Sequence, residues 1–412
     1  MRKTWLAVIF LANTCAGLVL NAGDFGLHPG WLGEAQKNFV EVLVTEPVKV
    51  SKSSNGGIMD GFALGINYPW LNCGWDFGDT AWGHRGISTP ASRAIVAADF
   101  VRMRASGAKV VRWFVMADGR ASPEFDSRGM VTGFDKFFYA DMDAALEIAK
   151  ANDIKLVLVL FDFKLLDDAK VINGVQTGGR ANLVKDPAAM RSLFDNALIP
   201  LFERYGNHPA ILAWEVMNEP EVRMKGFVYP GARAVGSQQV LGFTKQIAEK
   251  YGNHPSTFAW RGMNEPKMGM MKYFINFGAK TVEPYQMHNF ARQVATLVHA
   301  HTSQLVTLGS VMSSEVAQWK GVGLDFYQYH YYDYMALMFE PFDVKYSEMK
   351  LDKPCVLGEF GTKSIKPLKT YLNTMLNNGF AGAWAWSYRA EDVHSNFNSI
   401  ADLFADWAKA HK

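Results

Sequence analysis

Lys155-Leu-Val-Leu-Val-Leu-Phe161 contains six consecutive apolar residues, without alternation of polar and apolar positions. A run of this kind is typical of a parallel strand that is covered on both faces. Such strands occur in α/β proteins, where helices flank the sheet. The run therefore predicts a parallel sheet with helices packed around it.

Similar β-rich runs recur along the chain, separated by longer stretches with helical patterns. They are Phe62–Asn67, Lys109–Met116, Ile211–Met217, Gln304–Gly309, Asp325–His330, Cys355–Phe360 and Gly382–Ser387. Eight strands that alternate with helices are the count of a closed barrel. An open, doubly wound sheet is the alternative, but no Gly-x-Gly-x-x-Gly turn follows the first strand. We therefore predict an α/β protein with a (β/α)8 TIM barrel.

The stretches between the strands carry helix start and stop signals. Asp186-Pro187 is an N-cap followed by proline at the first helical position. Asp141–Ala151 has apolar residues at helical spacing, and Leu368–Leu376 ends at Asn377-Asn378-Gly379, a good C-terminal stop. These signals predict helices over the three stretches.

One strand and its helix occur twice in tandem. Glu203-Arg-Tyr-Gly-Asn-His-Pro209 recurs as Glu249-Lys-Tyr-Gly-Asn-His-Pro255, and Ala213-Trp-Glu-Val-Met-Asn-Glu-Pro220 recurs as Ala259-Trp-Arg-Gly-Met-Asn-Glu-Pro266. Because a repeat fold needs about three such units, two copies indicate a duplication inside the barrel. Only one copy can supply the fourth strand, so the other is expected as an insertion.

The first copy is the better candidate for the fourth strand. Ile211–Met217 is a coherent β run, whereas the second copy places Arg261-Gly262 mid-strand, and glycine weakens a strand interior. Loop length argues the other way, because the connection from Glu219 to the next strand is long, while that from Glu265 is more ordinary. We prefer Glu219, and Glu265 stays the alternative.

Two glutamates follow from this layout as a candidate catalytic pair. Glu219 comes after the fourth predicted strand and Glu359 lies near the end of the seventh. The carboxyl ends of barrel strands surround one pocket. Two carboxyl groups about 5–5.5 Å apart hydrolyse glycosidic bonds with retention, one as nucleophile and the other as acid and then base. The pair predicts a retaining glycoside hydrolase.

Trp214-Glu-Val-Met-Asn-Glu-Pro220 and Val356-Leu-Gly-Glu-Phe-Gly361 resemble the catalytic strands of the clan A glycoside hydrolases, especially family 5, the cellulase and β-mannanase family. The similarity covers about residues 60 to 405. Asn-Glu-Pro alone is a weak signal, but both motifs at the expected strands form a strong one. The resemblance implies Glu359 as nucleophile, Glu219 as acid/base, and no cofactor or metal.

The resemblance also implies substrate-binding residues at other strand ends. Arg112 matches an arginine that holds the nucleophile, and Tyr332, in a pair with His330, matches a tyrosine that bonds it. Trp386 matches a tryptophan beneath the sugar at the cleavage point, and Asn218 an asparagine that bonds the 2-hydroxyl of that sugar. Taken singly, each of these residues is equally compatible with an ordinary structural role.

The chain departs from the family at the end of the third strand. The family usually has a histidine there, whereas this chain has Phe161-Asp162-Phe163, which weakens an assignment to the core cellulase subgroup. The loop Trp70–Trp82 is rich in aromatic residues and glycine, and it suits either stacking on pyranose rings or capping of the barrel. β-Mannan and β-glucan both stay open as substrates.

Composition limits the kinds of partner. The formal charge is +2, and without Arg2 and Lys3 the 42 basic residues fall to 40, equal to the 40 acidic ones. A neutral chain without a basic cluster argues against nucleic acid. We expect a neutral polysaccharide or oligosaccharide as partner, no nucleic acid, no stable membrane insertion, and a monomer.

The N-terminus has the pattern of an export signal, with Met1-Arg2-Lys3, an apolar run over Trp5–Leu20, and a small-residue cleavage site at Asn21-Ala22-Gly23. An uncleaved anchor is the alternative. We expect a signal peptide over 1–22, an N-terminal extension over 23–60 and the (β/α)8 catalytic domain over 61–412, in a secreted or periplasmic protein.

Outside the signal segment the chain has two cysteines, Cys73 and Cys355. The predicted layout places them at opposite ends of the barrel, so two unpaired thiols are expected. No CxxC, HExxH or clustered His/Cys motif indicates a metal site.

Two other functions stay open. A glycosyl-transferring enzyme would use the same pocket and differ in its products. A carbohydrate-binding barrel without catalysis would result if the duplication had displaced the acid/base strand, and neither Glu219 nor Glu265 would then lie near Glu359.

Overall fold

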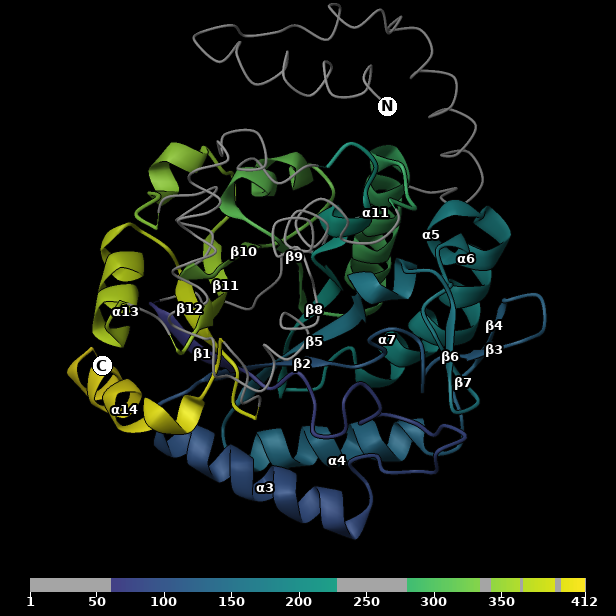
Figure 1. The fold of residues 1–412 in the computed structure, drawn as a ribbon, viewed down its shortest axis with the longest axis horizontal. Coiled ribbons are helices and arrows are strands. Elements are labelled where there is room, and N and C mark those ends of the chain that lie inside the picture. The colour runs from purple at the N-terminus through teal and green to yellow at the C-terminus, as the bar shows by residue number, and fades with distance from the viewer. Residues whose placement is uncertain (1–60, 228–279, 334–341, 364–365, 390–393, 412) are drawn as a thin grey trace, which may run out of the picture. The chain divides into compact units, whose positions relative to one another are not determined.

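Eight parallel strands close into a barrel within the part of the chain that the computed structural model describes, residues 61–227, 280–333, 342–363, 366–389 and 394–411 (Figure 1). Around the barrel the order is β1-β2-β5-β8-β9-β10-β11-β12. The strands are β1 (Ala63–Asn67), β2 (Val110–Phe114), β5 (Lys155–Asp162), β8 (Ile211–Asn218), β9 (Leu305–Ser310), β10 (Tyr327–Tyr331), β11 (Cys355–Gly361) and β12 (Gly382–Trp386). The predicted (β/α)8 barrel is confirmed, with strand ends within two residues of those expected.

The first copy of the duplicated segment supplies the fourth barrel strand. β8 pairs with β5 from Leu156–Ile211 to Asp162–Asn218, and on its other side it pairs with β9. Its residues are all buried, as a coherent β run predicts. The preference for the first copy as strand is therefore confirmed. The second copy, Glu265 included, and the predicted signal peptide and N-terminal extension lie outside the described residues.

Helices follow the strands, as the alternating pattern predicts. The α-helices are α3 (Pro90–Ala105), α4 (Phe138–Ala151), α5 (Asn182–Lys185), α6 (Pro187–Leu193), α7 (Ile199–Tyr205), α11 (Pro284–His301), α13 (Leu368–Asn377) and α14 (Ala401–Ala410). Short 3-10 helices are η2 (Phe163–Leu166), η4 (Pro220–Arg223), η7 (Ser313–Trp319), η8 (Tyr346–Met349) and η9 (Phe397–Ser399), and a π-helical turn, η3 (Phe194–Leu198), joins α6 to α7.

The three predicted helices are present with their expected caps. The Asp186 side chain accepts hydrogen bonds from the backbone N–H groups of Ala188 and Ala189, and proline occupies the first position of α6. Residue Gly379, just beyond α13, has a φ of +85°, which glycine adopts without the steric cost of a side chain. α4 begins at Phe138, three residues before the predicted start at Asp141.

The helices pack on the outside of the barrel, where α3 and α4 lie side by side (Figure 1). α11 contacts β8 and β9, and α13 contacts β12 and α14. Two small hairpins, β3 (Glu124–Phe125) with β4 (Val131–Gly133) and β6 (Lys170–Ile172) with β7 (Val175–Thr177), extend the loops after β2 and β5. None of the helices in the described ranges is both long and apolar enough to cross a membrane.

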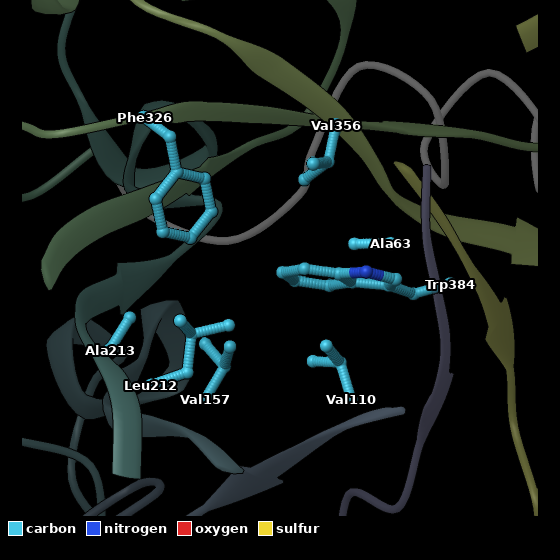
Figure 2. Close-up of a cluster of buried hydrophobic side chains, with 8 residues drawn as sticks. All are labelled: Ala63, Val110, Val157, Leu212, Ala213, Phe326, Val356 and Trp384. Carbon is cyan, nitrogen blue, oxygen red and sulfur yellow. The ribbon is translucent and has the colours of Figure 1, made fainter. Parts of the chain in front are cut away.

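An apolar cluster contains residues from six barrel strands, and the polar residues lie towards the carboxyl ends of the strands. Figure 2 shows Ala63, Val110, Val157, Leu212, Ala213, Phe326, Val356 and Trp384, with the indole ring of Trp384 among the smaller side chains. Most of these residues lie in the amino-terminal halves of their strands. Barrel interiors are packed in layers in this way, which reserves the carboxyl ends for polar chemistry.

The two cysteines are free thiols in different environments. Cys73 is exposed in the loop after the carboxyl end of β1, and Cys355 is buried at the amino end of β11. Since β1 and β11 run parallel in the barrel, these positions are at opposite ends of it, as predicted.

Candidate active site

The residues that the sequence predicts as catalytic or substrate-binding all lie in or directly after barrel strands. They are Arg112 in β2, Asn218 at the end of β8, Glu219 directly after it, His330 in β10, Tyr332 just beyond β10, Glu359 in β11 and Trp386 at the end of β12. Hydrogen bonds or ion pairs connect all of them except Trp386, which packs with Trp70 against Phe114, Ala117 and Val159.

The two candidate catalytic glutamates lie close together. One carboxylate oxygen of Glu219 and one of Glu359 are within 4.8 Å of each other. Retaining glycosidases separate their carboxyl groups by about 5–5.5 Å, and inverting ones by about 6.5–9.5 Å to leave room for a water. The side chain of Glu219 is 17% exposed and that of Glu359 only 5%. The short separation fits the retaining geometry.

Both oxygens of Glu359 are held by donors. Arg112 Nη1 donates to Oε1 at 2.6 Å, and the Tyr332 hydroxyl donates to Oε2 at 2.6 Å. These are the contacts that the resemblance implies for Arg112 and Tyr332. A carboxylate held at both oxygens has a fixed orientation, as an attacking group requires.

Arg112 is fully buried and uses all of its five N–H groups. Nε and Nη2 donate to the two oxygens of Glu215 at 2.7 and 2.6 Å, and Nη2 also donates to Asn218 Oδ1 at 2.8 Å. Nη1 donates to Asn67 Oδ1 at 3.0 Å in addition to Glu359. Arg112 therefore reaches a substrate through Glu359 and Asn218, since none of its own surface is exposed.

Sequence reasoning missed Glu215 and Asn67. Glu215 is fully buried and also accepts a hydrogen bond from Gln328 Nε2 at 2.7 Å. A signal was present, because a glutamate inside an otherwise apolar strand needs a buried partner. The second copy carries Arg261 at the matching position, which offers no carboxylate to Arg112. Asn67 ends β1, and its amide also donates to the carbonyl oxygen of Gly358 at 2.9 Å.

Glu219 adopts an unusual backbone conformation, with φ of 46° and ψ of 47°. A left-handed conformation costs a non-glycine residue about 1–3 kcal/mol, and such positions cluster at functional sites. The N–H of Glu219 donates to the carbonyl oxygen of Gly309 at 2.7 Å, and Pro220 follows at the start of η4. The bend ends β8 and leaves the Glu219 side chain beside His330, whose Nδ1 lies 2.7 Å from Oε1 of Glu219.

The environment separates the roles of the ionisable groups. Burial, and next the negative charge of Asp162, raises the pKa of Glu219 to about 8. Burial also raises the pKa of Glu359, while the neighbouring His330, the charge of Arg112 and the hydrogen bond from Tyr332 oppose that rise. Burial lowers the pKa of His330 to about 4, so this ring is neutral at pH 7. Glu219 therefore holds a proton at neutral pH, as a general acid must.

Glu219, His330 and Glu359 also form the one group of possible metal ligands found among the described residues. The Arg112 guanidinium bonded to Glu359 would repel a cation at this position.

The aromatic loop after β1 both caps the barrel and offers ring surface. Phe77 is fully buried, whereas Trp70, Trp75 and Trp82 keep part of their surface exposed. The buried carboxylate of Asp76 anchors the loop, because it accepts hydrogen bonds from the backbone N–H groups of Leu71 and Asn72 and from Trp113 Nε1. The two interpretations of this loop, as cap and as sugar-binding surface, are therefore compatible.

No protein-family model matches the chain. Two relatives are mannan endo-1,4-β-mannosidases. The one from Cryptopygus antarcticus is 28% identical over 371 residues, 81% of this chain and 83% of the relative. The one from Mytilus edulis is 27% identical over 360 residues, 83% of this chain and 88% of the relative. Among solved structures, the endo-1,4-β-mannanase from Eisenia fetida superposes with a TM-score of 0.63 at 23% identity, covering 87% of this chain and 94% of that one.

The barrel and the sequence likeness together identify the chain as a glycosidase, an enzyme that cleaves O-glycosidic bonds. The predicted resemblance to glycoside hydrolase family 5, the cellulase and β-mannanase family, is confirmed, and both relatives are named as mannanases and not as cellulases.

The Arg112–Glu215 pair predicts a large stability difference between two Glu→Leu variants. Glu215→Leu leaves the buried guanidinium without its bidentate partner, and we expect a loss of about 3–5 kcal/mol in the free energy of unfolding. Glu147 pairs with Arg93 at 2.6 Å, but its side chain is 62% exposed, and Glu147→Leu should change stability by less than about 1 kcal/mol. Urea unfolding of both variants provides the measurement, and equal losses would contradict the assignment.

Proposed function

We propose that the chain hydrolyses internal β-1,4-mannosidic bonds of mannan by double displacement, with Glu359 as nucleophile and Glu219 as acid/base. The observation that carries the proposal is the separation of at most 4.8 Å between carboxylate oxygens at the ends of β8 and β11. The choice of mannan over glucan is supported by the two relatives, which are both mannan endo-1,4-β-mannosidases.

In the first step Glu359 attacks the anomeric carbon while Glu219 gives its proton to the departing glycosidic oxygen. The bonds from Arg112 and Tyr332 hold the attacking carboxylate and stabilise its negative charge before the reaction. Glu219 meets the need for a proton donor because its raised pKa of about 8 keeps it protonated at neutral pH. The products of the step are a glycosyl ester on Glu359 and the departing part of the sugar chain, on which the former glycosidic oxygen is now a free hydroxyl.

In the second step Glu219, now ionised, takes a proton from a water that attacks the same carbon from the vacated side. The ester bond to Glu359 breaks, and the carboxylate returns to its partners Arg112 and Tyr332. Two inversions give net retention, and no cofactor takes part. Asn218 would donate to the 2-hydroxyl of the sugar, and Trp386 would lie beneath its ring.

The two alternatives fare differently. Transfer of the glycosyl group to a second sugar needs the same ester and differs only in the acceptor, so product analysis separates it from hydrolysis. A binding barrel without catalysis requires that the acid/base glutamate be displaced from Glu359, and the closeness of Glu219 to Glu359 does not favour it.

We also propose export, on the sequence pattern of residues 1–22. Export predicts that protein recovered from the medium begins near Gly23, which N-terminal sequencing would check.

Three Glu→Gln variants test the catalytic assignment. Glu359→Gln removes the nucleophile and should abolish release of reducing sugar from mannan. Glu219→Gln removes the general acid and should lower kcat by about 10²–10⁴-fold. Glu265→Gln is the matched control, because it makes the same change in the second Asn-Glu-Pro and should leave activity within about twofold of wild type.

Release of reducing sugar is measured on β-glucans as well as β-mannans, for the wild type and all three variants. If Glu265→Gln lost activity while Glu219→Gln stayed active, Glu265 and not Glu219 would be the acid/base. A folded wild type that binds mannan without cleaving it would refute the hydrolase proposal.

The raised pKa of Glu219 predicts the alkaline limb of the pH profile. The acid is protonated below its pKa of about 8, so kcat/KM should hold up to about pH 8 and fall tenfold per unit above it. A glutamate with its ordinary pKa of about 4.3 would have lost the proton well below neutrality. The profile is measured on mannan and on a dinitrophenyl mannobioside, whose leaving group needs no acid. The fall of kcat/KM above pH 8 should be smaller on the second substrate. An equal fall on both substrates would mean that a group other than Glu219 causes it.

A further inference from the structure

Asp162 ends β5 at the position where family 5 usually has a histidine, and neither of the steps above uses it. The residue is 7% exposed, and it lies beside Asn218 in the strand register. Oδ2 accepts a hydrogen bond from Asn218 Nδ2 at 2.8 Å, and Oδ1 accepts one from the backbone N–H of Lys164 at 3.0 Å. Burial raises the pKa of Asp162, and the charge of Lys164 and the two hydrogen bonds oppose that rise. Because both oxygens accept, the contacts fit an ionised carboxylate.

The Asn218 amide lies between opposite charges. Its Oδ1 accepts from Arg112 Nη2 at 2.8 Å, and its Nδ2 donates to Asp162. A guanidinium can only donate and an ionised carboxylate can only accept, so the amide has a single orientation. One of its two N–H groups is used by Asp162, which leaves the other for a ligand. The amide that would bind the sugar hydroxyl is therefore held at both its oxygen and its nitrogen.

Asp162 also contributes to the electrostatic surroundings of Glu219. The charged or titratable groups that face Glu219 are Asp162 at the end of β5, Lys164 just after it, Arg112 on β2, Glu215 on β8, His330 on β10 and Glu359 on β11. After burial, the charge of Asp162 is the largest cause of the raised pKa of Glu219, and Arg112 and Lys164 oppose it. Removal of that negative charge would make Glu219 lose its proton more easily.

We propose that Asp162 is a positioning residue for the reaction: its carboxylate clamps the Asn218 amide against Arg112 and places negative charge near Glu219, the residue that directly follows Asn218. The inference rests on the proposed function, because it needs Glu219 to be the acid. It names a residue that acts through Asn218 and Glu219 and does not touch the sugar itself.

Two variants separate the two effects of Asp162. Asp162→Asn keeps an oxygen that can accept from Asn218 but removes the charge, so the alkaline limb of kcat/KM should move to lower pH while KM changes little. Asp162→Leu removes the charge and the acceptor together. It should show the same movement of the limb and a further loss of about ten- to hundredfold in kcat/KM, the usual size for one charge-assisted hydrogen bond.

Asp118→Asn is the matched control. Asp118 lies in the loop after β2, and both of its oxygens already bond to Arg120, at 2.9 and 2.7 Å. The charge of Asp118 raises the pKa of Asp162, so its removal favours the ionised form of Asp162, and the control should leave the alkaline limb where wild type has it. A limb that stays in place in Asp162→Asn, or that moves as far in the control, would refute the electrostatic role.

A measurement on the free enzyme tests the clamp without any turnover. The urea unfolding midpoints of Asp162→Leu, Asn218→Ala and the double variant should be non-additive, since each single change breaks the same hydrogen bond. Additive changes would refute the clamp. If the wild type cleaved no glycan, the proposed function would fail, and the unfolding result would still decide whether Asp162 holds Asn218.

Discussion

A buried arginine organises the carboxyl end of this barrel. Arg112 has no exposed surface, and a guanidinium in such a place is stable only if its donors are satisfied and its charge is balanced. The partners come from three other strands: Asn67 from β1, Glu215 and Asn218 from β8, and Glu359 from β11. The requirement to satisfy one cation thus holds four strand ends in register, and the candidate nucleophile is one of the groups that it fixes.

The two candidate catalytic carboxyls differ because only one of them belongs directly to that network. Glu359 accepts from Arg112 and Tyr332, and both donors favour its ionised form. Glu219 sits at the bend after β8 beside a neutral His330 and near the negative Asp162. Burial raises the pKa of both, but Arg112 and Tyr332 oppose that rise at Glu359, so the same residue type meets a different environment as nucleophile and as acid.

The barrel was predictable from the sequence because its signals are local. A strand buried on both faces, such as β5, reads as an unbroken apolar run, and caps such as Asp186-Pro187 need only neighbouring residues. The choice between the duplicated copies also followed from strand quality. The positions of Glu219 and Glu359 followed from the motifs once the strands were counted.

The supporting groups were not predictable in the same way. Arg112 meets Glu215 across 103 positions of the chain and Glu359 across 247, so no local pattern links them. Asp162 was visible only as a departure from the family, and its role depends on the register that sets it beside Asn218. A charged residue within an apolar strand predicts that a buried partner exists. Which residue is the partner depends on how the strands are arranged in the closed barrel.

All five N–H groups of Arg112 end on the protein, and this has a consequence for how such a barrel can change its sugar. Arg112 fixes Glu359 but has no N–H group left to bind the substrate. Selection between one hexose and another would fall to Asn218, Trp386 and the loop of residues 70–82. Substitutions in the loop of residues 70–82 would therefore change which sugar is bound without changing any hydrogen bond of Arg112.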